Sequence, residues 1–264
     1  MRNLNLEKIY VDKKNVVTAH RGFSGRFPEN TLMAFREAVN IGADIIEFDI
    51  RGTKDIVPVV LHDPTLDRTS DAEGPVGDYT LKELKAFNFS FWSGSHNVGE
   101  KLSAAAFENI KIPAFEEVLE AFSDKICMNI QLYDTSGPLL SQICALYKEY
   151  DLYQTGYLTV GTYPEAEKIL YIDRNIPLCV LDHQGNMTPE TLRELKSFGC
   201  KYIQPFRNDV NEEFCKRVKE LSLSANMFFS DTEEDNSKFI AIGIQGILTN
   251  FPDILLTQIG QIYA

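Results

Sequence analysis

Four side chains that could do chemistry lie at or near the ends of short apolar runs in this sequence. His20 ends the run "NVVTAH" and His62 ends "VPVVLH", so two of the four histidines occupy such positions. Glu47 and Asp49 lie two residues apart in a third run, "DIIEFDI". If these runs are strands of one barrel, their carboxyl ends meet where such barrels gather their catalytic groups. The pattern predicts one site that combines two acids with two histidines.

The spacing of the two acids indicates what they could bind. Side chains two apart in a strand share a face, so Glu47 and Asp49 would point into the barrel while the apolar residues between them face the surrounding helices. Two carboxylates forced together repel each other unless a cation lies between them. An oxygen-ligated Mg2+ or Ca2+ is one solution. A salt bridge with Arg21 or Arg51 is the alternative.

Two histidines beside a metal ion and an arginine suit the cleavage of a phosphate ester by general acid–base catalysis. One histidine activates the nucleophile and the other protonates the leaving oxygen, while the cations take up phosphoryl charge. The sequence therefore favours phosphate-ester chemistry at this site.

The elements that would position these residues alternate between strands and helices. We expect nine strands, at 15–20, 44–50, 57–62, 125–133, 156–160, 177–181, 201–204, 223–229 and 246–249. Helices lie between most of them, with start signals at Thr188-Pro189-Glu190 and at Asn211. The alternation predicts an α/β fold, and a TIM (β/α)8 barrel in particular, because polar strand ends recur and no GxGxxG turn follows the first strand. Since a closed barrel needs eight strands, we expect one short candidate to be irregular or extra, with 201–204 and 246–249 the weakest.

One segment interrupts the alternation. An insertion of about 50 residues, at about 64–112, follows the third strand and shows little helical pattern apart from "YTLKELKAF". Long irregular segments in compact domains are usually lids, binding loops or small subdomains. The segment contains His96 and an aromatic cluster, which consists of Phe87, Phe89, Phe91 and Trp92. We expect Trp92 to contact the substrate, and packing of the insertion onto the barrel is the alternative.

Composition excludes several classes of protein. A chain of 264 residues without a linker or low-complexity block is expected to form a single domain over residues 1–264. Its net charge of −12 argues against nucleic acid or an anionic membrane surface as the main partner. Five scattered cysteines indicate reduced thiols, and no signal-peptide or membrane-spanning run is present, so we expect a cytoplasmic protein. The oligomeric state is left open.

Four stretches resemble the glycerophosphodiester phosphodiesterase family. They are "AHRGFSGRFPENTLMAF", "GADIIEFDIRGTKDIVPVVLHDPTLDRTS", "IPAFEEVLEAF" and "GIQGILTNFPDILL", and the resemblance runs from about residue 16 to residue 256. It implies a TIM barrel with a divalent cation at its mouth. It also implies hydrolysis of a glycerophosphodiester to glycerol 3-phosphate and an alcohol.

The resemblance assigns roles to the residues that match. His20 and His62 match the acid–base pair, Arg21 matches a phosphate ligand, and Glu47 and Asp49 match two metal ligands.

The loop residues beside them also match. Glu29 and Asn30 are expected to support the active-site loop. Gly22 would let the backbone approach the phosphate closely.

The fourth strand, "KICMNIQLY", departs from the family pattern. Where the family carries a glutamate ligand and, two residues later, a lysine, this chain has Gln131 and Tyr133. Gln131 is expected to be a weaker third metal ligand and Tyr133 a substrate-binding residue in place of the cation. The turn that usually reads Lys-Asp-Gly has Ile56 as its third residue, and Ile56 is expected to avoid a positive φ.

These departures leave three functions open. The first is metal-dependent hydrolysis of a glycerophosphodiester. The second is a weakly active or inactive homologue that binds a phosphorylated polyol. The third is a lyase that forms a cyclic phosphate from a substrate hydroxyl.

Overall fold

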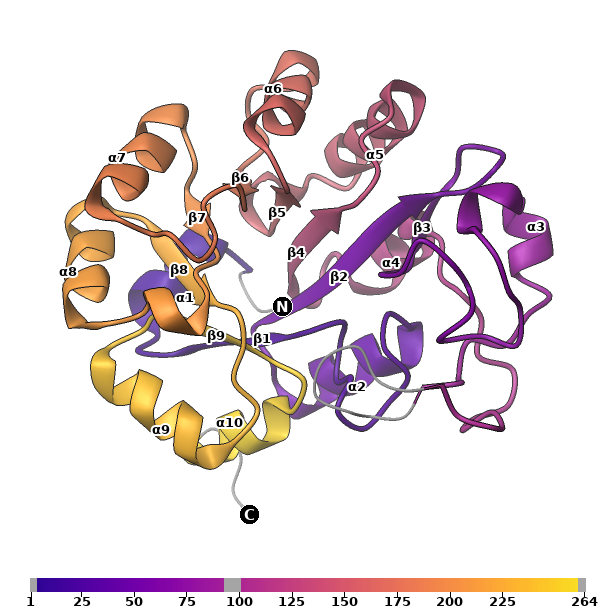
Figure 1. The fold of residues 1–264 in the computed structure, drawn as a ribbon, viewed down its shortest axis with the longest axis horizontal. Coiled ribbons are helices and arrows are strands. Elements are labelled where there is room, and N and C mark those ends of the chain that lie inside the picture. Colours follow the sequence, from indigo (N-terminus) through magenta and orange to yellow (C-terminus); the bar gives the residue numbers. More distant parts are fainter. Residues whose placement is uncertain (1–3, 93–100, 261–264) are drawn as a thin grey trace.

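A sheet of parallel strands lies at the centre of the molecule, and helices surround it (Figure 1). The structure is a computed structural model that describes residues 4–92 and 101–260. The parallel strands are β1 (Val16–Ala19), β2 (Ile45–Gly52), β4 (Cys127–Leu132), β5 (Gly156–Val160), β6 (Leu178–Val180), β7 (Tyr202–Ile203), β8 (Ser224–Met227) and β9 (Gly246–Thr249). Their order is β6-β5-β4-β2-β1-β9-β8-β7, with β6 and β7 neighbouring each other across the remaining gap. The described strands thus form a nearly closed barrel, which confirms the predicted architecture.

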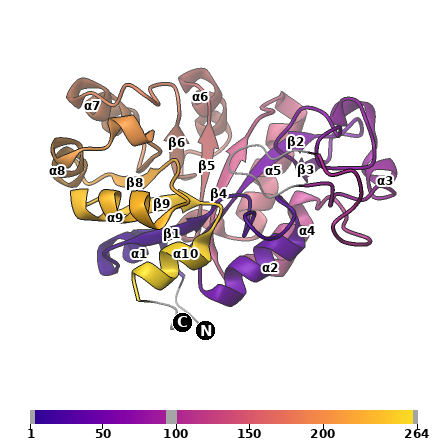
Figure 2. The same cartoon turned by 60° about the horizontal axis from the view of Figure 1, so that its bottom comes forward.

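The helices pack around the outside of this barrel. Figure 2 shows α7 and α8 on one side of the strands and α2 and α4 on the other. The helices described are α1 (Leu6–Asp12), α2 (Leu32–Ile41), α3 (Leu81–Leu84), α4 (Phe115–Phe122), α5 (Gly137–Glu149), α6 (Tyr163–Ile172), α7 (Pro189–Phe198), α8 (Glu212–Glu220), α9 (Glu233–Ile242) and α10 (Pro252–Gln258). Thr188 and Asn211 cap α7 and α8 as their positions predict, since each side chain accepts a hydrogen bond from the backbone N–H three residues on.

The extra strand is β3 (Pro58–Val60), and the expectation that it would be 201–204 or 246–249 was wrong. Both of those segments belong to the barrel, whereas β3 runs antiparallel to β2 and pairs with no other strand. The reason is the length of the connection, because only residues 53–57 separate β2 from β3. A parallel return needs a crossover of a dozen or more residues, so a short turn can only produce an antiparallel pair.

The turn between β2 and β3 also corrects a prediction. Ile56 has a φ of 65°, the left-handed conformation that its β-branched side chain was expected to avoid. Hydrogen bonds hold it there: its N–H donates to the Thr53 carbonyl, and the N–H of Val57 donates to the Thr53 hydroxyl. The Thr53 hydroxyl in turn donates to Asp55. The closed turn therefore imposes the conformation on whichever residue occupies position 56.

Strand register brings the predicted inward faces of β2 and β4 together. Glu47 pairs with Asn129 and Asp49 pairs with Gln131. The intervening residues of β2 are buried against the helices, and the Phe48 ring lies 5.5–6.0 Å from rings on α2 and α4. The period-two prediction for β2 is therefore confirmed.

The lower end of the barrel interior is apolar. Ile45 and Cys127, one pleat below the acids, pack with stacked Tyr157 and Tyr202, and Leu6 and Tyr10 of α1 join the same cluster. This packing fills the bottom of the barrel. Polar side chains are therefore gathered toward the end where the strands terminate.

The segment between β3 and α4 forms a small hydrophobic cluster of its own. Residues 59–92 and 101–112 contribute buried side chains that include Leu66, Leu84 and Phe89, and these described parts of the segment lie outside the barrel (Figure 1). Trp92 is buried, with 8% of its surface exposed. His96, which belongs to the same segment, lies outside the described residues.

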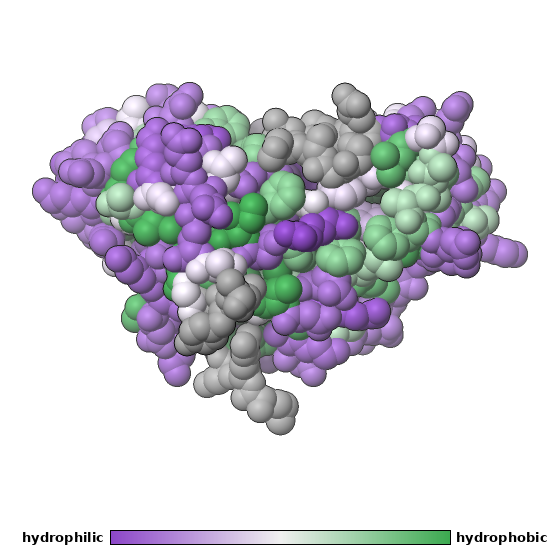
Figure 3. Space-filling view, turned by 90° about the horizontal axis from the view of Figure 1, so that it is seen from below, coloured by the Kyte–Doolittle hydropathy of each residue, from purple (hydrophilic) through white to green (hydrophobic). Residues whose placement is uncertain are grey.

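The outer surface is mainly polar. In Figure 3 hydrophilic residues dominate the margins of the face shown, and apolar residues lie mostly toward its middle. No helix within residues 4–92 and 101–260 has the length and apolar character required to cross a membrane.

Candidate active site

The two acids of β2 lie buried in the barrel, each about 1% exposed. Glu47 accepts a hydrogen bond from the Arg21 backbone N–H at 2.9 Å, and Asp49 accepts one from the Asn30 amide at 2.8 Å. Burial, reinforced by the Asp49 charge, raises the pKa of Glu47 well above its usual range. The pair is thus electrostatically strained and would be relieved by a cation.

Arg21 provides part of that relief. Its Nε lies 3.3 Å from Asp49 Oδ2, so the salt bridge considered as the alternative to a metal is present for one of the two acids. Asp49 Oδ1, however, is buried without a hydrogen-bond partner. A buried carboxylate oxygen left unpaired is costly, which leaves a ligand position for a cation.

The donor set fits a hard cation with one neutral ligand. The side chain of Gln131, in register with Asp49, donates through Nε2 to the Tyr133 hydroxyl at 2.6 Å, which leaves its amide oxygen to act as a ligand. Within the described residues, no three His, Cys, Asp or Glu side chains gather with metal-site geometry. A cation here would therefore depend on two carboxylates and an amide, all of them oxygen ligands of the kind Mg2+ and Ca2+ prefer.

His20 follows β1 and is held as a neutral ring. Its Nδ1 lies 2.7 Å from Asn250 Oδ1, and the Asn250 amide in turn donates to Asp231 at 2.7 Å. Because the Asn250 oxygen can only accept, Nδ1 carries the proton and Nε2 carries the lone pair. Burial, followed by the Arg21 charge, lowers the pKa of His20 to about 3. His20 Nε2 lies 4.0 Å from Glu47.

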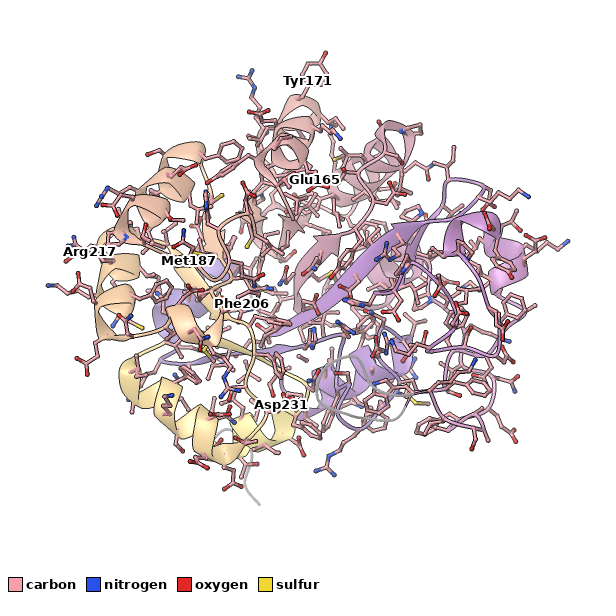
Figure 4. All side chains as sticks on the ribbon, viewed as in Figure 1. Glu165, Tyr171, Met187, Phe206, Arg217 and Asp231 are labelled. Atoms are coloured by element: carbon pink, nitrogen blue, oxygen red, sulfur yellow. The ribbon has the colours of Figure 1, made fainter. Side chains whose placement is uncertain are left out.

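Aromatic residues lead from His20 toward the surface. The His20 ring lies 5.4 Å from Phe228 and 6.3 Å from Phe229, and Phe228 lies 6.0 Å from Phe206. Phe206 is 40% exposed and projects over the strands, whereas the labelled Tyr171 lies at the periphery (Figure 4). The β7–β8 side of the mouth is therefore apolar.

His62 follows β3 and is held by a different kind of partner. The Leu61 N–H donates to the Asp49 carbonyl, which brings the returning chain back to the level of the acids. His62 Nδ1 lies 2.6 Å from a carboxylate oxygen of Asp63. Burial would raise the pKa of Asp63, but the hydrogen bonds from His62 and Arg68 outweigh it and hold that pKa below its usual range. His62 therefore faces a permanent negative charge.

Arg68 and Glu29 connect the two histidine loops. Arg68 binds both Asp63 and Glu29, and Arg21 donates to the same Glu29 carboxylate at 2.9 Å. Burial alone would raise the pKa of Glu29, but the Arg21 and Arg68 charges lower it to about 2. Glu29 thus supports the loops as expected, while Arg68 was missed, although it lies five residues after Asp63 in "HDPTLDR".

Gly22 has a packing role that the sequence did not predict. It has a φ of 80°, and a Cβ at this position would lie 2.7 Å from the Ala34 backbone and 2.9 Å from the Phe35 ring. The glycine is therefore required for the loop to pack against α2. Close approach of its backbone to a phosphate stays a prediction.

Tyr133, which directly follows β4, lies beside His62, and the Gln131 side chain is hydrogen-bonded to the Tyr133 hydroxyl. Tyr133 is 39% exposed, and its ring lies 5.2 Å from the His62 ring and 4.6 Å from the Arg51 guanidinium carbon. Burial, followed by the charges of Asp49 and Glu47, raises the pKa of the Tyr133 hydroxyl. The phenol is therefore neutral.

The structure brings His20, His62, Glu47, Asp49 and Gln131 together with Tyr133, whereas Trp92 lies in the inserted segment and its role as a substrate contact stays a prediction.

Comparison with known proteins places this site in a family. Residues 20–254 match the sequence model of the glycerophosphoryl diester phosphodiesterase family. The chain belongs to this family. A glycerophosphodiester phosphodiesterase of Bacillus altitudinis is 30% identical over 244 residues, covering 90% of this chain and 95% of the relative. A glycerophosphodiester phosphodiesterase of Caldanaerobacter subterraneus is 29% identical over 253 residues, covering 93% of this chain and 98% of the relative.

Solved structures of glycerophosphodiester phosphodiesterases share the fold. The enzyme of Agrobacterium tumefaciens superposes with a TM-score of 0.78 at 20% identity, covering 92% of this chain and 99% of that one. A phosphodiesterase of Oleispira antarctica, solved with the product sn-glycerol-3-phosphate, superposes with a TM-score of 0.76 at 22% identity, covering 92% and 96%. At this level of identity the likeness establishes the TIM barrel of the family.

Proposed function

We propose that this protein hydrolyses glycerophosphodiesters to glycerol 3-phosphate and an alcohol. The observation that carries the proposal is the pair of histidines at the barrel mouth, one beside a neutral amide and the other beside a carboxylate, above two buried acids. The sn-glycerol-3-phosphate bound by the phosphodiesterase of Oleispira antarctica supports this product class.

His20 is the proposed general base. Its proton is held on Nδ1 by Asn250, so Nε2 can accept a proton from the attacking water. The water oxygen then forms a bond to phosphorus. The pKa lowered to about 3 keeps the ring in its neutral, proton-accepting form at neutral pH.

His62 is the proposed general acid. The bond between phosphorus and the alcohol oxygen breaks, and the Nε2–H of a protonated His62 supplies the proton that the leaving oxygen needs. Asp63 accepts the Nδ1–H at 2.6 Å and balances the charge of the ring in this form. Exchange with solvent returns each histidine to its starting state.

Glu47, Asp49 and Gln131 are the proposed ligands of a divalent cation, Mg2+ or Ca2+. When bound, the cation would supply positive charge for the phosphoryl oxygens. Arg21, anchored by Glu29 and Asp49, is the proposed phosphate ligand. Cytoplasmic location and the lack of a nucleic-acid partner stay predictions from the sequence.

The first test is the release of glycerol 3-phosphate from glycerophosphocholine and glycerophosphoethanolamine. Native protein is assayed in EDTA, Mg2+ and Ca2+, beside the double variant Gln131→Glu/Tyr133→Lys. We expect native turnover that depends on the cation.

Product identity separates the alternatives. A cyclic phosphate in place of the monoester would identify a lyase. Activity in the double variant alone, with the native chain only binding a phosphorylated polyol, would replace hydrolysis with a binding function.

A further inference from the structure

Side chains from β2, and from β4 with the residue that follows it, lie in three successive rows along the inner face of the barrel. Glu47 pairs with Asn129, and Asp49 pairs with Gln131 one pleat higher. Period-two geometry puts Arg51 and Tyr133 one pleat higher again, and the N–H of Tyr133 donates to the carbonyl of Ile50. The outermost pair therefore lies directly over the acids, where the chain opens to solvent.

The other two guanidiniums of the site already have carboxylate partners. Arg21 is paired with Glu29 and Asp49, and it is only about 5% exposed. Arg68 is paired with Glu29 and Asp63. Each of these arginines has two carboxylates within ion-pair distance, so a phosphate bound by Arg21 would share that guanidinium with Glu29 and Asp49. A third guanidinium without such partners would add positive charge for the anion.

Arg51 differs from both. Across residues 4–92 and 101–260, no carboxylate lies within 4 Å of its guanidinium. It is partly exposed and is fixed at two points. Its Nε donates to the His62 carbonyl at 2.7 Å, and its guanidinium carbon lies 4.6 Å from the Tyr133 ring centre. A guanidinium held in place without a carboxylate at ion-pair distance is suited to bind an anion, because its fork of N–H donors is oriented before the ligand arrives.

We propose that Arg51 binds a phosphoryl oxygen of the substrate through its Nη groups, and that Tyr133 positions it for this. The inference rests on the proposed function, because it names a substrate-binding residue of that same site. Tyr133 acts through its ring, which holds the guanidinium by a cation–π contact beside His62. Its hydroxyl instead accepts a hydrogen bond from the Gln131 amide.

The test compares KM and kcat for glycerophosphocholine in native protein and in Arg51→Gln, with Arg193→Gln as the matched control. Arg193 is an exposed guanidinium on α7, and its ion pair among the described residues is with Glu190. Loss of a charge-assisted hydrogen bond should raise KM by about tenfold to a hundredfold in Arg51→Gln. Arg51→Lys should reverse only part of the rise in KM, because a lysine lacks the forked N–H donors of a guanidinium and its contact with the Tyr133 ring.

Two variants of Tyr133 separate the contribution of its ring from that of its hydroxyl. Tyr133→Leu should raise KM several-fold, and Tyr133→Phe, which keeps the ring over the guanidinium, should raise KM less. Combining Tyr133→Leu with Arg51→Gln should add little to Arg51→Gln alone, because the ring acts through the arginine. Additive effects in the double variant would overturn the positioning role.

Calorimetric binding of inorganic phosphate and sn-glycerol 3-phosphate, in EDTA and in Mg2+, separates this inference from the proposed function. Native turnover with an unchanged KM and unchanged anion binding in Arg51→Gln would overturn the role of Arg51 and leave hydrolysis standing. Anion binding that is weakened in Arg51→Gln, in a native protein that does not turn over, would support Arg51 and reject hydrolysis.

Discussion

The two histidines of the site differ in the atoms that contact their ring nitrogens. The amide oxygen of Asn250 holds a proton on His20 Nδ1, whereas a carboxylate oxygen of Asp63 lies at His62 Nδ1. Neither partner touches the reacting atoms in the proposed mechanism. In that mechanism, the difference in partners is what allows two chemically identical side chains to take opposite roles.

Replacement of His62 by alanine is expected to reduce the rate of hydrolysis at least about a hundredfold, the lower end of what acid–base catalysis supplies. The side chain is 23% exposed, so its removal should hardly move the thermal midpoint. Steady-state kinetics measure the rate, and a thermal melt on the same preparation measures the midpoint. An unchanged rate would reject His62 as the acid.

Replacement of Gln131 by glutamate is expected to tighten cation binding by about tenfold or more, since it restores a charged ligand beside Asp49. Titration calorimetry with Mg2+ and Ca2+ measures this without reference to activity. Gln154→Glu adds the same charge at an exposed position before β5 and serves as the control. Equal affinities in both variants would mean that Gln131 is not a ligand.

At the scale of elements, the β2–β3 hairpin is the part of the chain that brings His62 to the acids. β2 carries Glu47 and Asp49 upward, the turn at 53–57 reverses the chain, and β3 returns to the level of Asp49. His62 reaches the mouth from a strand that is not part of the barrel. The same hairpin positions Arg51, whose Nε donates to the His62 carbonyl.

The turn of this hairpin contains a residue in an unfavourable conformation. Ile56 is 41% exposed and has a φ of 65°, which costs a β-branched residue about 1–2 kcal/mol. Ile56→Gly should therefore raise the free energy of unfolding by up to about 1 kcal/mol, after allowing for the greater freedom of glycine in the unfolded chain. Urea unfolding with an unchanged m-value measures this change in the free energy of unfolding.

A neighbouring position provides the comparison for this turn. Val57 has an ordinary negative φ, so Val57→Gly should lower the stability. If Ile56→Gly lowers it as well, the left-handed turn is not strained.

At the scale of the whole molecule, a single ionic network joins parts of the chain that lie far apart in the sequence. Arg21 follows β1, Glu29 precedes α2, and Asp63 and Arg68 follow β3. The shared Glu29 carboxylate is buried, and both guanidiniums depend on it. Protonation of that one group should therefore loosen both histidine loops.

Acid unfolding should report this network. The pKa of Glu29 is lowered to about 2 in the folded protein, against an ordinary value of 4.5. Because the unfolded chain takes up the proton first, the stabilisation is complete above about pH 4.5 and is lost as the pH falls toward 2. The loss amounts to about 3 kcal/mol for this group.

Glu29→Gln tests the assignment. The variant should be less stable at neutral pH by about 3–5 kcal/mol, because two buried guanidiniums lose a partner, and its stability should vary less between pH 4.5 and 2. Urea melts at several pH values, with exposed Glu190→Gln as the control, check this. A pH dependence equal to that of the native chain would show that other acids govern acid unfolding.

The sequence by itself determined the barrel, the inward acids and the location of both histidines at strand ends. These follow from local rules, since period-two alternation and the order of strands and helices are written along the chain. It also predicted inward positions for Gln131 of β4 and for Tyr133, which directly follows that strand, because the same alternation applies there.

Tertiary structure decided which partners prepare those residues. Asn250 reaches His20 from 230 positions away, and Arg68 reaches Glu29 from 39 positions away, so no spacing rule could pair them. The structure also decided that β3 lies outside the barrel and that Ile56 takes a left-handed conformation, since hydrogen bonds across the closed turn override the preference of one residue. Local patterns decide which way a side chain points, whereas its charge state and its contacts depend on what the folded chain brings beside it.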